Sequence, residues 1–232
     1  MIYNIAIDGP AGAGKSTIAK KVAEELSCVY VDTGAMYRAM ALYLLQNNVD
    51  KEKPEEIGRI CQGAEISIVY ENKEQVVLLN GENVNMYLRS EEVGNMASVS
   101  SANPKVREKL LDLQRKLAAS MSVVMDGRDI GTTILPDADV KIYLTASSLT
   151  RAKRRFLELQ EKGIQCSLSE IQKDIEKRDE RDMNREISPL KQADDAVLVD
   201  SSEMTIQEVV NCILQIFREK VILSDEVGKN EG

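Results

Sequence analysis

The stretch Gly9-Pro10-Ala11-Gly12-Ala13-Gly14-Lys15-Ser16 decides the fold class, because it matches the phosphate-loop pattern G-x-x-x-x-G-K-[ST]. Its glycines let the backbone curl so that successive N–H groups point at phosphate oxygens, and a following helix adds the positive end of its dipole. In this pattern Lys15 reaches the β and γ phosphates, and the Ser16 hydroxyl is a ligand of Mg²⁺. The alternative is a glycine-rich turn without a ligand, although a chance match arises in only about one chain in a hundred of this length.

The residues on both sides of the loop supply the strand and the helix that the pattern requires. Ile2–Ile7 is a short, β-branched apolar run, which predicts a buried strand. Ser16–Ser27 has apolar residues at intervals of four, which predicts a helix with one apolar face. Cys28–Val31 predicts a second strand. A strand–helix–strand unit of this kind indicates a parallel sheet with a right-handed crossover.

The rest of the chain continues as an α/β domain, with one segment that departs from the pattern. Glu65–Tyr70 and Gln75–Leu79 are typical of a small antiparallel hairpin, which we interpret as an insertion. Asp32-Thr33-Gly34 predicts a turn. The other predicted strands are Ser122–Met125, Asp139–Leu144 and Ala196–Val199. The other predicted helices are Ala35–Gln46, Pro54–Gln62, Ser90–Ser101, Pro104–Ser120, Ser147–Lys162, Ser167–Arg185 and Met204–Lys220, and Val221–Gly232 is predicted to be a flexible tail.

Composition and charge exclude several classes of function. The 232 residues, 43% of them hydrophobic, suffice for one α/β domain. A net charge of −8 argues against a general nucleic-acid or membrane-surface binder, and two Phe with no Trp offer little for base stacking. The chain has no histidine, which excludes histidine triads, histidine metal sites and histidine general bases.

The cysteines and the N-terminus predict a cytoplasmic protein. The four cysteines are dispersed and form no C-x-x-C pair, which is typical of thiols in a reducing compartment. The first apolar run reaches a charge at Asp8, too early for a signal peptide. No stretch approaches the roughly 18 apolar residues of a membrane span.

Missing motifs narrow the choice among phosphate-loop proteins. The nearest approach to the guanine-reading motif Asn-Lys-x-Asp is Asn72-Lys73-Glu74-Gln75, which lacks the final aspartate. The Leu-Ser-Gly-Gly signature of transporter-type ATPases is absent. A dinucleotide fingerprint is excluded because Lys15-Ser16 follows the glycines. Small-molecule kinases remain.

Three arginine-bearing segments stand out in this acidic chain. In the first, Asp126-Gly127-Arg128-Asp129 follows a predicted parallel strand, whose carboxyl end faces the ligand crevice. Asp126 could hold Mg²⁺ through water, and Arg128 could hold a phosphate. The alternative is a common Asp-Gly turn with a surface ion pair.

The other two segments lie on predicted helices. Arg151-x-x-Arg154-Arg155 places the first arginine beside both others on one helix face. The segment from Arg178 to Arg185 interleaves arginines with acids, so a solvated ion-pair face is the alternative. Beside a phosphate loop, an arginine lid over polyphosphate is the better interpretation.

The missing histidine also indicates the kind of phosphoryl acceptor. A kinase that phosphorylates an alcohol generally needs a base or a positioning carboxylate for the hydroxyl proton. A phosphate monoester has a second pKa of about 6, so it is mostly a dianion at neutral pH. Such an acceptor needs cations rather than a base. The sequence therefore favours phosphoryl transfer to a nucleoside monophosphate.

The chain resembles the bacterial cytidylate (CMP) kinases, a family of nucleoside monophosphate kinases. The resemblance runs from about Ile2 to Lys220 and rests on four motifs, which are residues 9–17, Asp32-Thr-Gly-Ala-Met-Tyr-Arg38, Asp126-Gly-Arg-Asp-Ile-Gly-Thr132 and Arg178-Asp-Glu-Arg-Asp-Met-Asn-Arg185. It implies a P-loop NTPase-type parallel sheet flanked by helices, in one kinase domain. The core would be about residues 1–37, 90–150 and 190–220, the monophosphate-binding region with its insertion about 38–89, and the helical lid about 151–185.

The resemblance also implies a role for each site residue. Residues from Gly9 to Thr17 would hold ATP, with Lys15 catalytic, and Arg154 and Arg155 in the mobile lid over it. The CMP phosphate would be surrounded by Thr33, Arg38, Arg128, Arg178 and Arg185, of which the last three would also be catalytic. Ser98, Arg107 and Asp129 would read cytosine, and Asp182 with Arg178 would contact the sugar. Mg²⁺ would be held by Ser16 and, through water, by Asp126.

The implied reaction is ATP-dependent phosphorylation of CMP and dCMP by in-line transfer. The expected partners are these small molecules, with no nucleic acid and no membrane, and the expected state is a monomer. Two alternatives stay open at this point. The acceptor could be another monophosphate such as UMP, or the chain could be a regulatory module that binds ATP without transferring phosphate.

Overall fold

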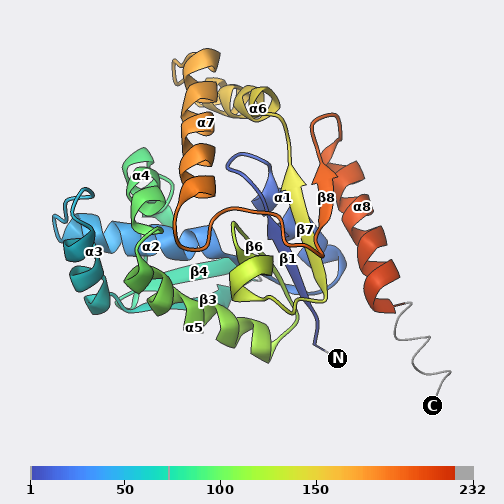
Figure 1. The fold of residues 1–232 in the computed structure, drawn as a ribbon, viewed down its shortest axis with the longest axis horizontal. Coiled ribbons are helices and arrows are strands. Elements are labelled where there is room, and N and C mark those ends of the chain that lie inside the picture. The colour runs from blue at the N-terminus through green and yellow to red at the C-terminus, as the bar shows by residue number, and fades with distance from the viewer. Residues whose placement is uncertain (1, 73, 223–232) are drawn as a thin grey trace.

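A parallel sheet with the strand order β2-β6-β1-β7-β8 forms the centre of the molecule (Figure 1). The computed structural model describes residues 2–72 and 74–222. The strands of the central sheet are β1 (Asn4–Asp8), β2 (Val29–Asp32), β6 (Val123–Gly127), β7 (Val140–Thr145) and β8 (Val197–Asp200). A small antiparallel sheet is formed by β3 (Ile66–Glu71), β4 (Glu74–Leu79) and β5 (Glu82–Asn83).

Helices cover both faces of the central sheet and extend past one of its edges (Figure 1). The α-helices are α1 (Lys15–Glu25), α2 (Thr33–Gln46), α3 (Pro54–Ile60), α4 (Glu91–Ser100), α5 (Pro104–Ser120), α6 (Ser148–Glu161), α7 (Leu168–Asn184) and α8 (Ile206–Phe217). Short 3-10 helices span Cys61–Gly63 and Asn85–Tyr87, and π-helices span Ile130–Ile134 and Arg218–Ile222.

The three inner strands of the central sheet, β1, β6 and β7, are largely buried on both faces because their side chains alternate between two cores. In β6, Val123 and Met125 join the core that also contains residues of α2, α4 and α5, whereas Val124 joins the core formed with α1 and α8. Ile5 of β1 likewise packs on the α1 side. Burial on both faces requires near-continuous apolar strands, which is the pattern visible in the sequence. The predicted fold class is confirmed.

The parallel arrangement brings distant segments of the chain to one edge of the sheet. Every pair of neighbouring strands in the central sheet runs in the same direction, so the carboxyl ends lie together. The phosphate loop follows β1 there, and Asp129 follows β6. The helices α6 and α7, which follow β7, extend beyond this edge and form the upper part of Figure 1. This edge is where the site residues meet.

Two boundaries differ from the sequence-based expectation because capping residues set them. Helix α2 begins at Thr33 rather than at Ala35, since the Asp32 carboxylate accepts a hydrogen bond from the Ala35 N–H at 2.9 Å and caps the first turn. Helix α8 begins at Ile206 rather than at residue 204, because Thr205 and Glu208 form a reciprocal capping box.

Two further expectations need correction, one at the end of β6 and one at the start of the predicted tail. Strand β6 extends to Gly127, so Asp126 lies within the strand rather than after it. Val221, predicted to begin a flexible tail, belongs to the π-helix Arg218–Ile222 that continues α8. The remainder of the predicted tail, residues 223–232, lies outside the described residues.

The insertion is a small sheet anchored to the central one. The short strand β5 pairs with β4, so the predicted hairpin has a third strand. The side-chain amide of Gln75 donates to the Asp32 carbonyl at 3.1 Å and accepts from the Asp32 N–H at 2.9 Å. The Tyr70 hydroxyl donates to the Tyr30 carbonyl at 3.2 Å. These contacts hold the insertion against the edge strand β2.

Asp8, the last residue of β1, positions the segment that follows β6. Its carboxylate accepts hydrogen bonds from the N–H groups of Ile130 and Gly131 at 2.8 and 2.7 Å, across 122 and 123 positions of sequence. Burial raises the pKa of Asp8 to about 6, although these two hydrogen bonds favour the ionised form. One buried side chain therefore links the start of the phosphate loop to the segment that carries Arg128 and Asp129.

We expect Gly9→Ala to destabilise the fold by roughly 3 kcal/mol or more. Gly9 has φ +149°, and a Cβ built there would lie 1.9 Å from the Leu144 carbonyl oxygen of β7. The matched control is Gly94→Ala in α4, where an added Cβ has no neighbour within 4 Å and should stabilise by about 0.5–1 kcal/mol. Urea unfolding of the two variants measures the difference, and equal stabilities would contradict this account of Gly9.

A second prediction concerns pH and Asp8. Because its pKa is raised from 3.8 to about 6, the folded protein binds the Asp8 proton more tightly than the unfolded chain does. The free energy of unfolding of the wild type, minus that of Asp8→Asn, should therefore fall by up to about 3 kcal/mol as pH rises from about 4 to about 6.5. Taking the difference cancels the other titrating groups. If urea titrations gave a difference that stayed flat or rose with pH, the pKa of Asp8 would not be raised in the folded protein.

Candidate active site

A cavity of about 740 Å³ lies at the carboxyl edge of the central sheet. Its wall includes residues of the phosphate loop, α2, α4, α5, α6, α7 and the segments after β6 and β8. Gly9 and Pro10 are the predicted site residues that do not line it. The predicted residues brought together on its wall are residues 11–17, Thr33, Arg38, Ser98, Arg107, Asp126, Arg128, Asp129, Arg154, Arg155, Arg178, Asp182 and Arg185.

On the phosphate-loop side, the chemistry centres on Lys15 and Asp126. Lys15 is buried, and its Nζ donates to the Pro10 carbonyl at 2.8 Å. Burial, followed by the nearby charge of Arg128, lowers the pKa of Lys15 well below its usual value. The Asp126 carboxylate accepts hydrogen bonds from Ser16 Oγ at 3.1 Å and from the Tyr30 hydroxyl at 2.9 Å. Burial raises the pKa of Asp126 to about 6, with a further contribution from Asp32.

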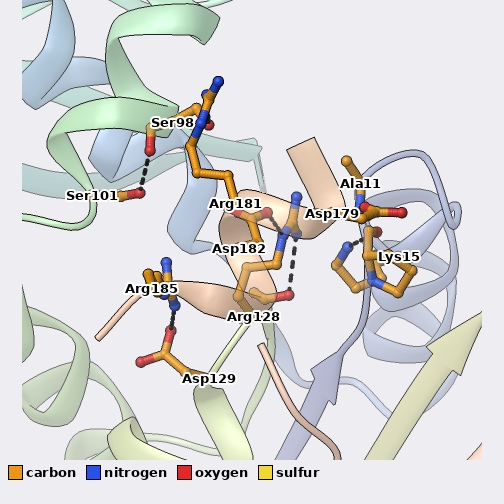
Figure 2. A network of polar contacts seen from close by, with 12 residues as sticks. Ala11, Lys15, Ser98, Ser101, Arg128, Asp129, Asp179, Arg181, Asp182 and Arg185 are labelled. Atoms are coloured by element: carbon orange, nitrogen blue, oxygen red, sulfur yellow. Dashed lines mark hydrogen bonds and ion pairs between the residues drawn. The ribbon is translucent and has the colours of Figure 1, made fainter. Parts of the chain in front are cut away.

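On the opposite side, the buried carboxylate of Asp129 is paired with two arginines. Asp129 accepts from Arg185 Nη2 at 3.3 Å and forms an ion pair with Arg107. The Arg107 guanidinium also lies over the Tyr37 ring, 5.6 Å from its centroid. These groups come from four separate segments of the chain, and Figure 2 shows Asp129 and Arg185 facing one another. The contacts fix the orientation of the Asp129 carboxylate.

The middle of the cavity carries positive charge that the protein does not fully neutralise. Arg128 Nε donates to Asp182 Oδ2 at 2.9 Å (Figure 2). Within residues 2–72 and 74–222, the buried Nε of Arg178 has no hydrogen-bond acceptor. Burial, followed by the charge of Arg128, lowers the pKa of Arg178 to about 10. A buried guanidinium without an acceptor, beside two further cations, is suited to a phosphate.

Helices α6 and α7 contact the phosphate loop through Arg151 and Asp179, to which the sequence motifs assigned no role of their own. Arg151 of α6 is buried; its Nη1 lies 2.7 Å from Asp179 Oδ2 and donates to the Ala11 carbonyl at 2.8 Å. Asp179 of α7 accepts from the Ala11 N–H at 3.3 Å. The only signal in the sequence was that both residues lie within arginine-rich segments. Nothing there distinguished them from their exposed neighbours.

The spacing of the three arginines places them side by side on α6, but their guanidinium groups contact different partners. Arg151 points to the phosphate loop, whereas Arg154 donates to the Ser201 carbonyl at 2.7 Å, in the segment after β8. Arg155 is half exposed and pairs with Glu158 at 3.1 Å. Their guanidinium groups therefore diverge, because their partners lie on the phosphate loop and α7, in the segment after β8, and on α6 itself.

The alternative of a solvated ion-pair face on α7 is wrong for the side that faces the cavity. Asp179 and Asp182 are buried and pair with arginines of other segments, whereas Lys177 and Glu180 on the same helix are exposed. Arg181, which received no predicted role, donates from Nη1 to Ser98 Oγ at 2.9 Å. The two ion pairs and the hydrogen bond from Arg181 do not follow from spacing along one helix, since their partners lie on other elements.

The described ranges 2–72 and 74–222 contain neither a cluster of metal-binding side chains nor a helix that could span a membrane. No three Cys, Asp or Glu side chains gather there in the manner of a metal site. No helix in the same ranges is long and apolar enough to cross a bilayer.

The comparison with solved structures supports the fold. A crystal structure of an uncharacterized protein from Eubacterium ventriosum ATCC 27560 superposes with a TM-score of 0.51 at 15% sequence identity, covering 94% of this chain and 99% of that one. At this level of identity the likeness concerns the fold alone.

The comparison with known sequences identifies the family. A cytidylate kinase from Lactobacillus johnsonii is 50% identical over 219 residues, covering 94% of this chain and 95% of that protein. A cytidylate kinase from Desulfitobacterium hafniense is 51% identical over 217 residues, covering 94% and 93% respectively. The family model described as cytidylate kinase matches residues 5–219. With the phosphate loop and the buried arginines in one cavity, these matches show that the chain is a phosphotransferase of the cytidylate kinase family.

Proposed function

We propose that this enzyme transfers the terminal phosphoryl group of ATP to CMP and dCMP, forming CDP and dCDP, with Mg²⁺ bound to the nucleotide. The observation that carries the proposal is the set of cations on the cavity wall. Lys15 of the phosphate loop, Arg128 and Arg178 line the same cavity as the Asp129 carboxylate, which is paired with arginines. Buried cations that depress one another's pKa are stabilised when anions bind between them. Two phosphate chains that meet end to end would supply those anions.

The donor nucleotide would occupy residues 9–17, with Arg154 and Arg155 closing over it. Ser16 and Asp126 fit a magnesium ion, because their hydroxyl and carboxylate oxygens lie 3.1 Å apart beside the loop. Mg²⁺ prefers oxygen ligands and keeps several waters, so Ser16, nucleotide phosphates and a water held by Asp126 form a suitable set. When bound, the ion would neutralise charge that develops on the phosphates. Lys15 would do the same from the opposite side.

The acceptor phosphate would lie among Thr33, Arg38, Arg128, Arg178 and Arg185. The free N–H of Arg178 supports this placement, because a phosphate oxygen would supply the acceptor that the described residues lack. The Thr33 hydroxyl donates to the Asp126 carbonyl at 2.7 Å, which fixes its oxygen at the junction with the donor side. Asp182, held by Arg128, would contact the sugar together with Arg178.

The base would be read by Ser98, Arg107 and Asp129. The pairing edge of cytosine presents an amine donor followed by two acceptors, whereas uracil presents an acceptor, a donor and an acceptor. A buried carboxylate matches the cytosine amine, and an arginine matches an acceptor. Uracil would leave Asp129 without its donor, and an unpaired buried polar group costs about 1–3 kcal/mol.

The chemical step needs positioning rather than a general base. The CMP phosphate is mostly a dianion near neutral pH, so its oxygen is already a nucleophile. Closure of the lid would exclude water that could hydrolyse ATP and would align the acceptor oxygen with the γ phosphorus. Lys15 and the arginines would then stabilise the charge on the transferring group. A chain without histidine can perform every one of these tasks.

We extend the proposal to the domain organisation, the oligomeric state and the cellular location of the enzyme. The region of about residues 38–89 would close over the monophosphate, and the lid of about 151–185 over ATP, around a core of about 1–37, 90–150 and 190–220. The grip of Arg151 and Asp179 on Ala11 supports a lid that responds to the phosphate loop. We further propose a monomer that works in the cytoplasm, on small molecules rather than on nucleic acid or membranes.

An ADP-release assay with ATP and Mg²⁺ and a panel of CMP, dCMP, UMP and AMP tests the proposal. We expect CMP and dCMP to be the best acceptors and AMP to be inactive. If UMP or another monophosphate were clearly preferred, the assigned acceptor would be wrong. If the protein bound ATP but no monophosphate released ADP, the regulatory-module alternative would replace the proposal.

The variant Arg128→Ala should lower kcat for CMP by at least about 100-fold, because it removes a cation from the transferring group. The variant should still fold, and kcat is measured well below its melting temperature, because the change removes the ion-pair partner of the buried Asp182. The matched control is Arg59→Ala on α3, an exposed arginine away from the cavity, which should keep full activity. Near-normal turnover of Arg128→Ala would remove that residue from the mechanism.

A further inference from the structure

Arg181 of α7 makes a contact that the proposed reaction does not use. Its Nη1 donates to Ser98 Oγ at 2.9 Å, across 83 positions of sequence. Figure 2 shows the Arg181 side chain extending from α7 toward Ser98 on α4 and the neighbouring Ser101, on the opposite side of α7 from Ala11. Ser98 is buried and lines the cavity, whereas Arg181 does not line it. Arg181 therefore acts on the site through Ser98.

This contact restricts the hydrogen bonds that Ser98 can make with a ligand. A serine hydroxyl can accept hydrogen bonds and can donate one. An arginine only donates, so the bond from Arg181 uses the accepting capacity of the Ser98 oxygen on that side. In the part of the chain that the structure describes, no group accepts the Ser98 O–H proton. Its hydroxyl is thus left with a proton to donate into the cavity.

The neighbouring hydroxyl is already committed. Ser101 Oγ donates to the Ser98 carbonyl at 3.1 Å, and the Ser101 carbonyl accepts from Arg107 Nη1 at 3.1 Å. Arg107 in turn pairs with Asp129. A continuous chain of polar contacts therefore runs along this wall, from Arg181 through Ser98 and Ser101 to Arg107 and Asp129. On the cavity side of this chain, the Ser98 hydroxyl can donate a hydrogen bond and the Asp129 carboxylate can accept one.

We infer that Arg181 is a specificity-determining positioning residue, which holds the Ser98 hydroxyl as a hydrogen-bond donor to a ring-nitrogen acceptor of the base. This inference rests on the proposed function, in which Ser98 and Asp129 read cytosine. The ring nitrogen N3 of cytosine accepts a hydrogen bond, whereas N3 of uracil carries a proton and donates. A hydroxyl held as a donor therefore favours cytosine. A hydroxyl released from Arg181 can turn and accept from uracil.

The test measures kcat/KM for CMP and for UMP in Arg181→Met, which removes the donor and keeps the length of the side chain. We expect the CMP/UMP ratio of kcat/KM to fall about tenfold, with most of the change in KM. Arg181→Lys, which retains a donor, should restore most of the ratio. The control is Lys177→Met on the same helix, an exposed residue, which should keep the wild-type ratio.

A double variant separates this role from a general structural one. In the Ser98→Ala background, Arg181→Met should change the ratio no further, because the hydroxyl that it orients is gone. Melting temperatures of all variants, measured alongside, should agree with the wild type within a few degrees. A wild-type ratio in Arg181→Met, or an equal tenfold fall in the Ser98→Ala background, would overturn the inference. A wild-type enzyme that uses UMP as well as CMP would instead overturn the proposed function.

Discussion

The site depends on holding several positive charges close together inside a protein. Lys15, Arg128 and Arg178 are brought to the carboxyl edge of a parallel sheet, where burial and mutual repulsion lower the pKa of the first and the last. Such a cluster is costly unless anions lie between its members. The protein offsets part of this cost with its own carboxylates: Asp182 pairs with Arg128, and the charges of Asp126 and Asp8 act on Lys15. The remaining positive charge is the driving force for binding phosphates.

Three buried carboxylates, one on the cavity wall and two beside it, hold the segments around the cavity in place. Asp8 ties the end of β1 to the segment that carries the acceptor-side groups, and Asp126 lies between the phosphate loop and β2. Asp179 joins α7 to the phosphate loop and to α6, through Ala11 and Arg151. In each case an acid from one segment meets a donor from another. The acids therefore supply the geometry, while the arginines supply the charge that faces the ligand.

This division explains why a protein with a net charge of −8 can bind polyanions. The acidic residues that pair inside the cavity orient arginines without cancelling their combined field, because the cations still outnumber them there. Most of the other acids are exposed at the surface, where solvent screens them. Net charge thus argues against binding to extended anionic surfaces, but it says nothing about the charge inside a buried cavity. The local arrangement of charges decides the ligand.

The sequence by itself determined the fold class, the phosphate loop and the segments that bear the arginines. Each of these is a local pattern, since apolar periodicity and the spacing of Gly9 to Ser16 record contacts between near neighbours in the chain. Only the tertiary structure decided which arginine meets which acid. Arg151 and Arg154 have the same local context, yet one grips Ala11 and the other Ser201. Arg181 likewise meets Ser98 only because α7 packs near α4, and contacts between distant segments leave no periodic trace in a single sequence.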